Sequence, residues 1–340
     1  VQERLERSKA RPADKITFRI GAITPVESDR WYEWWGQYRR SLQGGADSSA
    51  RKMVCFATGE FTEPAATHPK IRGLADVGGQ PTGSALISFD KDAFTSYSLD
   101  QSANCALSEE AAFAYRAALE ELLANHSYRL AGAKIVHWFR QPLKREDDLI
   151  DILLGGSEAQ EEAAAQAQAQ RLLRAIHAGE RPELIDNQFY ALTLSGSGGR
   201  VMVRDWMEGS FETLAQNILR WFDDLSIVHR EGNRLAEPPR FGAVVGALAR
   251  EIQDVPSPII SRLFRCAVTG SPLPDKAMAQ ALSRVRADIL TDSPFNHARL
   301  GILKATLIRK GGVSMKPALN PEHPSPAYHC GRLLAVLASL

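Results

Sequence analysis

The residues best suited to recognition chemistry lie in one glycine-rich loop. Gly78, Gly79 and Gly83 flank Gln80 and Pro81. Glycine lets a backbone approach a ligand closely, and an amide side chain can both donate to and accept from the edge of a base. The pattern predicts a binding loop that presents Gln80 at its tip. The alternative is a turn in which Gln80 bonds only its own loop.

Common motifs for catalysis and cofactor binding are absent from the sequence. It contains no GxGxxG, GxxxxGK(S/T) or GxSxG, and its eight histidines form no HExxH pattern. Asp147, Asp148 and Asp151 could bind Mg²⁺, but their place in KREDDLIDILLGG favours a solvated, charged edge. We therefore expect no catalytic residue, no cofactor and no metal.

Two other classes of protein stay open as hypotheses. A small-molecule enzyme could use the glycine-rich loop as a lid, with His68, Glu60 and Lys70 as its candidate residues. A purely structural scaffold is the other. Loss of turnover in a His68→Ala variant would indicate the enzyme, whereas loss of DNA affinity or assembly would indicate a subunit of a complex.

The net charge of +1 conceals a division along the chain. Residues 255–340 hold eleven Lys and Arg against four acids, a balance of +7, whereas residues 1–180 have a balance of −3. Binding of phosphate backbones gains affinity from counterion release, so the basic block predicts nucleic-acid contact. A solvated helical surface is the alternative. Strand alternation would also point Arg200 and Arg204 the same way, toward a phosphate or simply toward solvent.

Length and composition indicate a globular protein. The 340 residues are 44% hydrophobic and 24% charged, enough for two or three domains. No apolar run approaches the roughly 20 residues that cross a bilayer, and nothing resembles a signal peptide, so we expect a cytoplasmic location without membrane contact. The four cysteines form no CxxC pair, which predicts buried, reduced thiols.

The elements that would position these residues follow from apolar periodicity and capping signals. The RWYEWWGQYRR segment predicts a helix whose aromatic face packs, with stacking on unpaired bases as the alternative. The other predicted elements are a strand at 16–24, a helix capped by Ser108, a strand at 133–140, a surface helix at 158–178 after a hinge at Gly155 and Gly156, a hairpin around the five-residue loop SGSGG, a helix capped by Ser210, and proline-separated helices from Arg240 onward.

Several blocks of residues spread over most of the chain form a specific pattern. They are Thr58-Gly59-Glu60, His68-Pro69-Lys70-Ile71, Gly78-Gly79-Gln80, Ser88-Phe89-Asp90, Ala93-Phe94, Ser96-Tyr97, residues 108–115, 186–194, 204–206 and 327–337. In these blocks the chain resembles one family, the large subunit of the subtype I-C CRISPR Cascade surveillance complex. The family usually has Tyr-Gly and Asn-Ala-Pro where this chain has Tyr97-Ser98 and Asn104-Cys105-Ala106. Family members are longer at both ends, so we expect a fragment.

The resemblance implies a noncatalytic subunit in antiviral defence. Such a subunit would sit beside the backbone and guide-end subunits that carry the CRISPR RNA, help recognise target double-stranded DNA at its adjacent motif, and stabilise the displaced single strand of the R-loop. It would also recruit a helicase-nuclease. On this interpretation Gln80 reads or wedges the DNA, and the expected DNA-binding residues are Lys70, Arg72, Gly78, Gly79, Gln80, Gln101, Asn104, Arg200, Arg204, Arg262, Arg265, Arg284, Arg286, Lys304, Arg309 and Lys310.

The predicted fold class is α+β, with a mixed N-terminal part of short strands and hairpins followed by a mainly helical C-terminal domain. We expect four regions along the chain. They are an α/β region at 1–150 with the reading loop at 55–106, an Ala/Gln-rich helix and connector at 151–180, a β-hairpin plus helix at 181–235, and a basic helical domain at 236–340.

Overall fold

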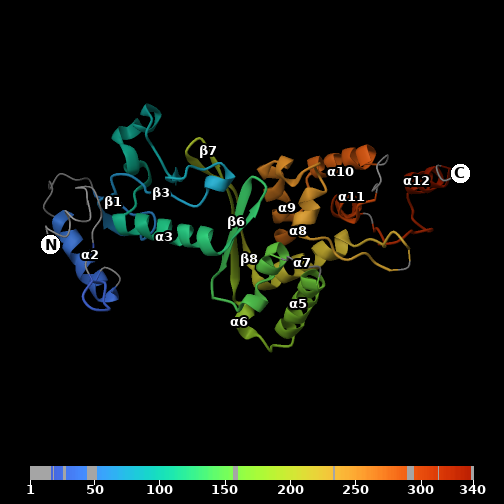
Figure 1. Ribbon diagram of the computed structural model, residues 1–340, viewed down its shortest axis with the longest axis horizontal. Coiled ribbons are helices and arrows are strands. Elements are labelled where there is room, and N and C mark those ends of the chain that lie inside the picture. The colour runs from blue at the N-terminus through green and yellow to red at the C-terminus, as the bar shows by residue number, and fades with distance from the viewer. Residues whose placement is uncertain are drawn as a thin grey trace.

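The protein combines a mixed sheet with helices, as predicted, and is 51% helical and 15% strand. The computed structural model describes residues 17, 19–25, 28–43, 52–155, 160–232, 234–288, 295–312 and 314–337. Figure 1 shows the N-terminal elements at one end of an elongated molecule, a sheet in the middle, and the C-terminal helices at the other end.

The central sheet has six strands in the order β3-β4-β8-β7-β6-β5. Neighbouring strands are antiparallel except for β4 and β8, which are parallel. A separate two-stranded sheet pairs β1 with β2. The strands are β1 Met53–Val54, β2 Phe61–Thr62, β3 Lys70–Ile71, β4 Ser84–Ala85, β5 Ser127–Leu130, β6 Ala133–Phe139, β7 Gln188–Ser197 and β8 Arg200–Ser210.

The β7–β8 hairpin is confirmed, but its turn is tighter than predicted. Only Gly198 and Gly199 lie between the strands, with φ of 55° and 83°. Two consecutive positive φ values match the hairpin turn whose twist fits the flanking strands, and glycine adopts them without strain. The five-residue loop that we expected is therefore wrong, because Ser195, Gly196 and Ser197 continue the strand.

Helices cover the sheet and build the main core. The α-helices are α2 Tyr32–Gln43, α3 Glu109–Asn125, α4 Leu149–Gly155, α5 Gln160–His177, α6 Pro182–Ile185, α7 Phe211–Leu225, α8 Phe241–Gly246, α9 Ser257–Thr269, α10 Asp275–Asp288, α11 His297–Gly311 and α12 Pro326–Leu337. Short 3-10 turns are η2 Asp29–Trp31, η3 Ala75–Val77, η4 Asp92–Phe94, η5 Ser96–Ser98, η6 Gln101–Cys105, η7 Arg145–Asp147 and η8 Ile252–Asp254.

Capping residues begin two of these helices as the sequence predicts. Ser108 accepts a hydrogen bond from the backbone of Ala111 at 3.1 Å, and Ser210 accepts one from Thr213 at 3.2 Å. Each bond satisfies a backbone N–H that has no partner within its helix. The apolar stripe of α7 is also confirmed, because Trp221 is fully buried within it.

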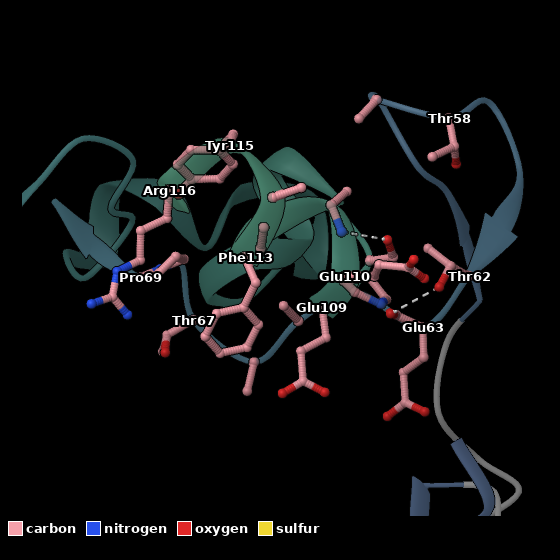
Figure 2. Close-up of a pocket in the computed structure, with 18 of the residues that line it drawn as sticks. Thr58, Thr62, Glu63, Thr67, Pro69, Glu109, Glu110, Phe113, Tyr115 and Arg116 are labelled. Atoms are coloured by element: carbon pink, nitrogen blue, oxygen red, sulfur yellow. Dashed lines mark hydrogen bonds between the residues drawn. The ribbon is translucent and has the colours of Figure 1, made fainter. Parts of the chain in front are cut away.

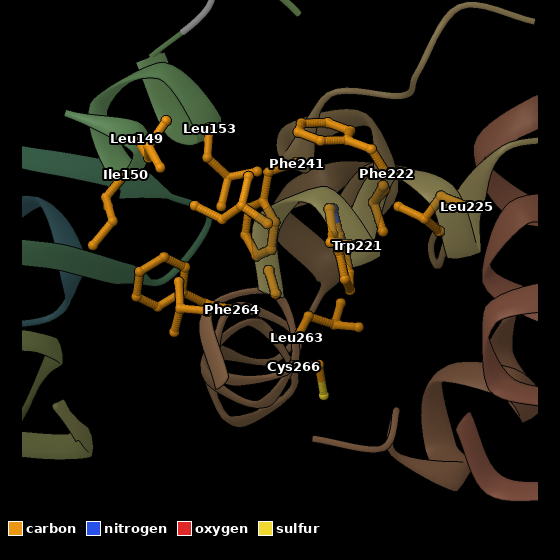
Figure 3. Packing of buried hydrophobic residues seen from close by; sticks show 14 of the residues in the cluster. Leu149, Ile150, Leu153, Trp221, Phe222, Leu225, Phe241, Leu263, Phe264 and Cys266 are labelled. Carbon is orange, nitrogen blue, oxygen red and sulfur yellow. The ribbon is translucent and has the colours of Figure 1, made fainter. Parts of the chain in front are cut away.

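One apolar cluster joins the sheet to the helices. It includes Ile135 on β6, Leu172 on α5, Trp221 on α7, Phe264 on α9 and Ile302 on α11. Figure 3 shows Trp221, Phe241 and Phe264 directed toward one another from three different helices. A second, smaller cluster packs Ile71 and Leu74 against α3.

The strand predicted at 16–24 does not form in the described residues. Residues 19–24 form a turn with an isolated bridge from Ile20 to Ile23, not a strand; residues 16 and 18 lie outside the described part. Helix α5, expected at the surface with a thin apolar stripe, exposes Gln170 and Arg171 and buries Leu172 and Leu173. Its hinge residue Gly156 is outside the described residues, and Gly155 ends α4.

The helix predicted at 30–40 forms, but its aromatic face is not packed into the core. Trp31, Trp34, Trp35 and Tyr38 all remain exposed. They contact one another instead, with the rings of Trp34 and Tyr38 stacked at 5.2 Å. The spacing correctly places them together, whereas burial requires an opposing surface that the described residues do not provide.

Candidate nucleic-acid interface

The glycine-rich loop packs its backbone against the end of the β7–β8 hairpin. Gly78 has φ of 89°, and a Cβ atom there would lie 2.7 Å from the carbonyl oxygen of Gly196. A Cβ atom on Gly196 would overlap the backbone of Gly79. The glycines therefore permit a close approach between two segments of this protein, which sequence reasoning assigned to a ligand.

Gln80 is exposed at the edge of this contact. Its backbone N–H donates to the hydroxyl of Ser84 at 2.9 Å, and its carbonyl accepts from Gly83 at 3.0 Å. A Cβ atom on Gly199 would lie 3.9 Å from Cγ of Gln80, so the side chain runs beside the hairpin turn. The backbone of Gln80 is fixed while its side chain reaches solvent.

Two cations flank this tip on one row of the sheet. Lys70 pairs with Ala85, and Ala85 pairs with Arg200. Residues that pair directly across strands point to the same face, about 10 Å apart when one strand lies between them. Both side chains are exposed, and Arg200 has only a surface ion pair with Asp90 at 3.4 Å, which contributes little to stability.

A second loop is tied to the same hairpin through Asp90 and is held by Asn104. The side-chain amide of Asn104 donates to the carbonyls of Phe94 at 2.9 Å and Gln101 at 3.2 Å. Asn104 thus holds its own loop and makes no bond to the glycine-rich loop in these contacts, while Gln101 is exposed. Arg72 is exposed as well, and its backbone donates to Glu120 at 2.9 Å.

Tyr97 is a feature of this loop that sequence reasoning missed. It is 92% exposed and has φ of 61°, and Ser98 follows with φ of 56°. Residues other than glycine rarely adopt this left-handed backbone conformation. The signal was present where the chain has Tyr97-Ser98 in place of the family's Tyr-Gly, because glycine at the second position would meet the backbone requirement.

Arg200 and Arg204 bind different partners in the structure. A register shift on β7 between Thr193 and Leu194 leaves Arg204 without a directly opposing residue. Such a bulge interrupts the alternation of side chains along the strand. The Nε of Arg204 donates to the Ser195 hydroxyl at 2.8 Å, whereas Arg200 contacts Asp90 on another loop.

Two residues of the basic block, Lys304 and Arg309, make hydrogen bonds in the interior of the protein. Lys304 is buried, and its ammonium donates to the carbonyls of Asp223 at 2.9 Å and Asp224 at 3.1 Å. Burial lowers the pKa of this lysine. The Arg309 side chain is 1% exposed and donates from Nε to Asp224 at 2.6 Å. Neither side chain is at the surface, so the prediction that Lys304 and Arg309 bind DNA is wrong for this structure.

Other candidates in the block are paired at the surface. Arg265 donates to Asp205 from two nitrogens, at 2.7 Å from Nε, which raises its pKa. Arg284 donates to Asp288 at 2.6 Å, and Lys310 contacts Asp275. Arg262 and Arg286 are exposed, and among the described side chains neither has an ion-pair partner. Part of the block's charge is thus taken up by ion pairs with Asp205, Asp224, Asp275 and Asp288.

The three residues named for a possible enzyme, His68, Glu60 and Lys70, do not lie in one pocket. Glu60 and Lys70 line one groove, but His68 does not. The ring of His68 lies 3.1 Å from the carbonyl of Cys105 and accepts from Tyr115 at 3.3 Å, and burial lowers its pKa. The three candidates therefore do not converge on one reacting atom.

Cys55 is the most acidic thiol for which a shift is resolved. Hydrogen bonds from Thr58 and from the backbone of Ser108 lower its pKa to about 6. The residue is fully buried, so a substrate cannot reach its sulfur. The cysteines at 55, 105, 266 and 330 are free; the first and third are buried as predicted, whereas Cys330 is exposed.

The acidic run after β6 forms structural contacts, not a solvated edge. Asp147 is buried and accepts from Arg181 at 2.8 Å. Asp148 accepts from the backbone of Asp151 at 2.9 Å and contacts His137 at 2.8 Å. Within the described ranges no group of three potential ligands could hold a metal ion.

A comparison with known protein families identifies the family of this chain. A family model described as "CRISPR-associated protein (Cas_Csd1)" matches residues 1–340. The chain therefore belongs to this family of CRISPR-associated proteins, the large subunits of I-C type Cascade complexes. A search of curated proteins gave no match. None of the helices in the described part is long and apolar enough to cross a membrane.

Proposed function

We propose that this protein is a noncatalytic large subunit that helps recognise target double-stranded DNA beside its adjacent motif. It would bind next to the subunits that carry the guide RNA, hold the displaced strand of the R-loop, and recruit a helicase-nuclease. Family membership supports its place in a Cascade complex. Base pairing with the guide would supply most of the sequence specificity.

The exposed amide of Gln80 is the observation that carries the DNA-reading role. Its backbone is fixed by the Ser84 contact and by the glycine-packed hairpin. Lys70 and Arg200 lie on one row of the neighbouring strands. An amide that can read a base edge, flanked by cations that can contact phosphates, matches the two kinds of contact that position and specify a DNA complex.

A Gln80→Ala variant in the reconstituted guide RNA complex tests this role. We expect roughly tenfold to a hundredfold weaker binding to DNA with the correct adjacent motif, because one bidentate base contact is lost. Binding to DNA with a scrambled motif should not change. Gln170→Ala on α5 is the matched control, since Gln170 is also exposed but lies on a helix outside this tip. Unchanged binding to both DNAs would reject the reading role.

The same assay at two salt concentrations distinguishes base recognition by Gln80 from phosphate contacts by Lys70 and Arg200. Replacing both Lys70 and Arg200 by Gln should weaken binding to both DNAs alike. It should also reduce the slope of log affinity against log salt concentration by about two. A loss restricted to the correct motif would contradict the phosphate role. The equivalent change at Lys304 is unsuitable as a comparison, because that side chain is buried.

A further inference from the structure

Three aromatic side chains form a patch on one face of the central sheet, one each from β6, β7 and β8. They are Trp138, Tyr190 and Trp206, here called the aromatic patch. The ring centroid of Trp138 lies 5.6 Å from that of Tyr190 and 5.6 Å from that of Trp206. The centroids of Tyr190 and Trp206 are 6.0 Å apart. The three rings thus form one continuous surface, which has no role in the DNA-reading proposal.

The aromatic patch lies on a part of the sheet that α3 leaves uncovered. Trp138 pairs with Tyr190, and Trp206 pairs with Leu192, two residues further along β7, so all of them share one face. Leu192 packs against the apolar cluster beneath α3, to which the three rings do not belong. Figure 1 shows that α3 meets the sheet with its C-terminal end and that the strands continue past it toward α6. Trp206 is 44% exposed, and Trp138 and Tyr190 are half-buried.

The aromatic patch is separate from the large groove at the other end of α3. Figure 2 shows α3 side chains between Glu109 and Arg116 along that groove. None of the three patch residues lines it. The patch is therefore a candidate binding surface in its own right, because exposed aromatic surfaces are typical of binding sites.

The polar atoms of the aromatic patch bond to neighbouring side chains and fix the rings. The indole N–H of Trp206 donates to the carboxylate of Glu208 at 3.2 Å, and the hydroxyl of Tyr190 donates to Gln188 at 3.0 Å. Glu208 pairs directly with Tyr190 across the strands, so its side chain lies on the same face as the rings. A ligand therefore meets ring surfaces and one carboxylate that is held beside them.

The charge at the aromatic patch favours a cation as its ligand. Glu208 is exposed and has no ion-pair partner among the described side chains. Arg140 follows the end of β6, and β7 separates it from the strand of Glu208. The face of an aromatic ring carries the negative part of its quadrupole. Rings and carboxylate thus attract a cation together, and the carboxylate repels phosphate.

We propose that the aromatic patch binds an arginine side chain of another protein subunit of the complex. A guanidinium group is planar, so it stacks on an aromatic ring while its N–H groups donate to a carboxylate, here that of Glu208. A subunit that holds guide RNA needs Arg and Lys to contact phosphates, so the proposed neighbours carry such side chains. The inference rests on family membership in a Cascade complex, and it is independent of whether Gln80 reads DNA.

A Glu208→Gln variant tests the carboxylate. Glutamine keeps the shape of the side chain and an oxygen that accepts from Trp206, so the variant removes the charge alone. We expect it to enter the reconstituted guide RNA complex about tenfold more weakly, with a difference that shrinks at high salt. The matched control is Glu251→Gln, since Glu251 is also exposed and accepts from an uncharged side chain two residues away, that of Gln253.

The outcomes of this test distinguish an arginine from a nucleic acid. Equal incorporation of the two variants would reject the proposal. Tighter incorporation of Glu208→Gln would also reject it, because loss of a negative charge favours an anionic ligand. Arg140→Gln should not weaken incorporation if the ligand is arginine, and a salt-dependent loss would indicate phosphate instead. Failure of the DNA-reading role is seen separately, as unchanged motif binding by Gln80→Ala.

Site-specific crosslinking identifies the occupant directly. Val203 is 50% exposed and pairs with Leu194, two residues from Leu192, so it lies on the face of the aromatic patch. With benzoylphenylalanine in place of Val203 in the reconstituted complex, ultraviolet light should attach a protein segment that contains Arg close to the crosslink. Benzoylphenylalanine at the exposed Leu319 is the control and should not yield that segment. A crosslink to guide RNA or DNA, to a segment without Arg, or to nothing would overturn the proposal.

Discussion

At the scale of single residues, backbone conformation sets apart the loop that carries Tyr97. Tyr97, Ser98 and Gln101 all have positive φ, with values of 61°, 56° and 45°. Three such residues within five positions store strain, which surrounding contacts must offset. The hydrogen bonds that the Asn104 amide donates to three carbonyls of this loop are part of those contacts.

Ser98→Gly should stabilise the protein by about 1 kcal/mol, because glycine adopts the left-handed region without the Cβ penalty. Urea unfolding followed by circular dichroism measures the change. The matched control is Ser96→Gly, since Ser96 is in the same 3-10 turn but does not have positive φ. That control should be neutral or destabilising, and a gain equal to that of Ser98→Gly would contradict the assignment of strain to position 98.

Single residues also explain why charge counts are a poor guide to surfaces. Lys304 and Arg262 are both in the basic block, yet one is buried on backbone carbonyls and the other is exposed. The sequence reports the charge of each side chain but not its partner. Partner choice decides which cations remain available for phosphate.

At the scale of elements, the glycine-rich loop and the β7–β8 hairpin form one unit. The backbone of Ala85 donates to the carbonyl of Gly199 at 2.9 Å, and the backbone of Gly79 donates to that of Leu74 at 2.8 Å. The first bond extends the sheet to β4 at the hairpin end, and the second closes the loop on itself. The position of Gln80 therefore depends on a strand more than a hundred residues away.

Gly196→Ala should separate these two elements, because its Cβ atom would overlap the backbone of Gly79. We expect a loss of roughly 1–3 kcal/mol in the free energy of unfolding, as is typical of overpacking. Affinity for DNA with the correct motif should fall as well. Gly132→Ala, where a Cβ atom meets nothing within 4 Å, is the control for a glycine change in a turn. Equal effects of the two changes would argue against the close contact.

At the scale of the whole molecule, the shared core couples the hairpin, α7 and the C-terminal helices. Arg309 on α11 illustrates this coupling. It donates to Asp224 on α7 and to the carbonyls of Cys266 at 2.6 Å and Ser271 at 3.1 Å, and it lies 5.6 Å from the Trp221 ring. A side chain that joins three segments in this way contributes to the fold and not to the surface.

Arg309→Ala should cost roughly 3–5 kcal/mol in the free energy of unfolding, because it leaves the carboxylate of Asp224 largely buried without this partner. Unfolding in guanidinium, followed by tryptophan fluorescence and by circular dichroism, should shift as one transition. Lys310→Ala changes the next, exposed cation and should alter stability by less than about 1 kcal/mol. Unchanged stability of Arg309→Ala with weaker, salt-dependent DNA binding would instead restore the predicted phosphate role of Arg309.

The parts of the fold that could be predicted depend on neighbours in the sequence. The caps Ser108 and Ser210, the strand Ala133–Phe139, and the stripe of α7 follow from residues within a few positions, and all are confirmed. The aromatic spacing of α2 and the thin stripe of α5 are equally local signals. They predicted both helices correctly, but the predicted packing of the aromatic face of α2 is wrong, because burial depends on what another part of the chain places opposite it.

The sequence by itself determined the family, the α+β class and the glycine-rich loop with Gln80 between its turns. Only the tertiary structure decided that Gly78 and Gly196 meet, that a bulge leaves Arg204 without an opposing residue, and that Lys304 and Arg309 are internal. The physical reason is that caps, turns and periodicity act over a few residues. The partner of a charged side chain is chosen among groups that are distant along the chain and adjacent only after folding.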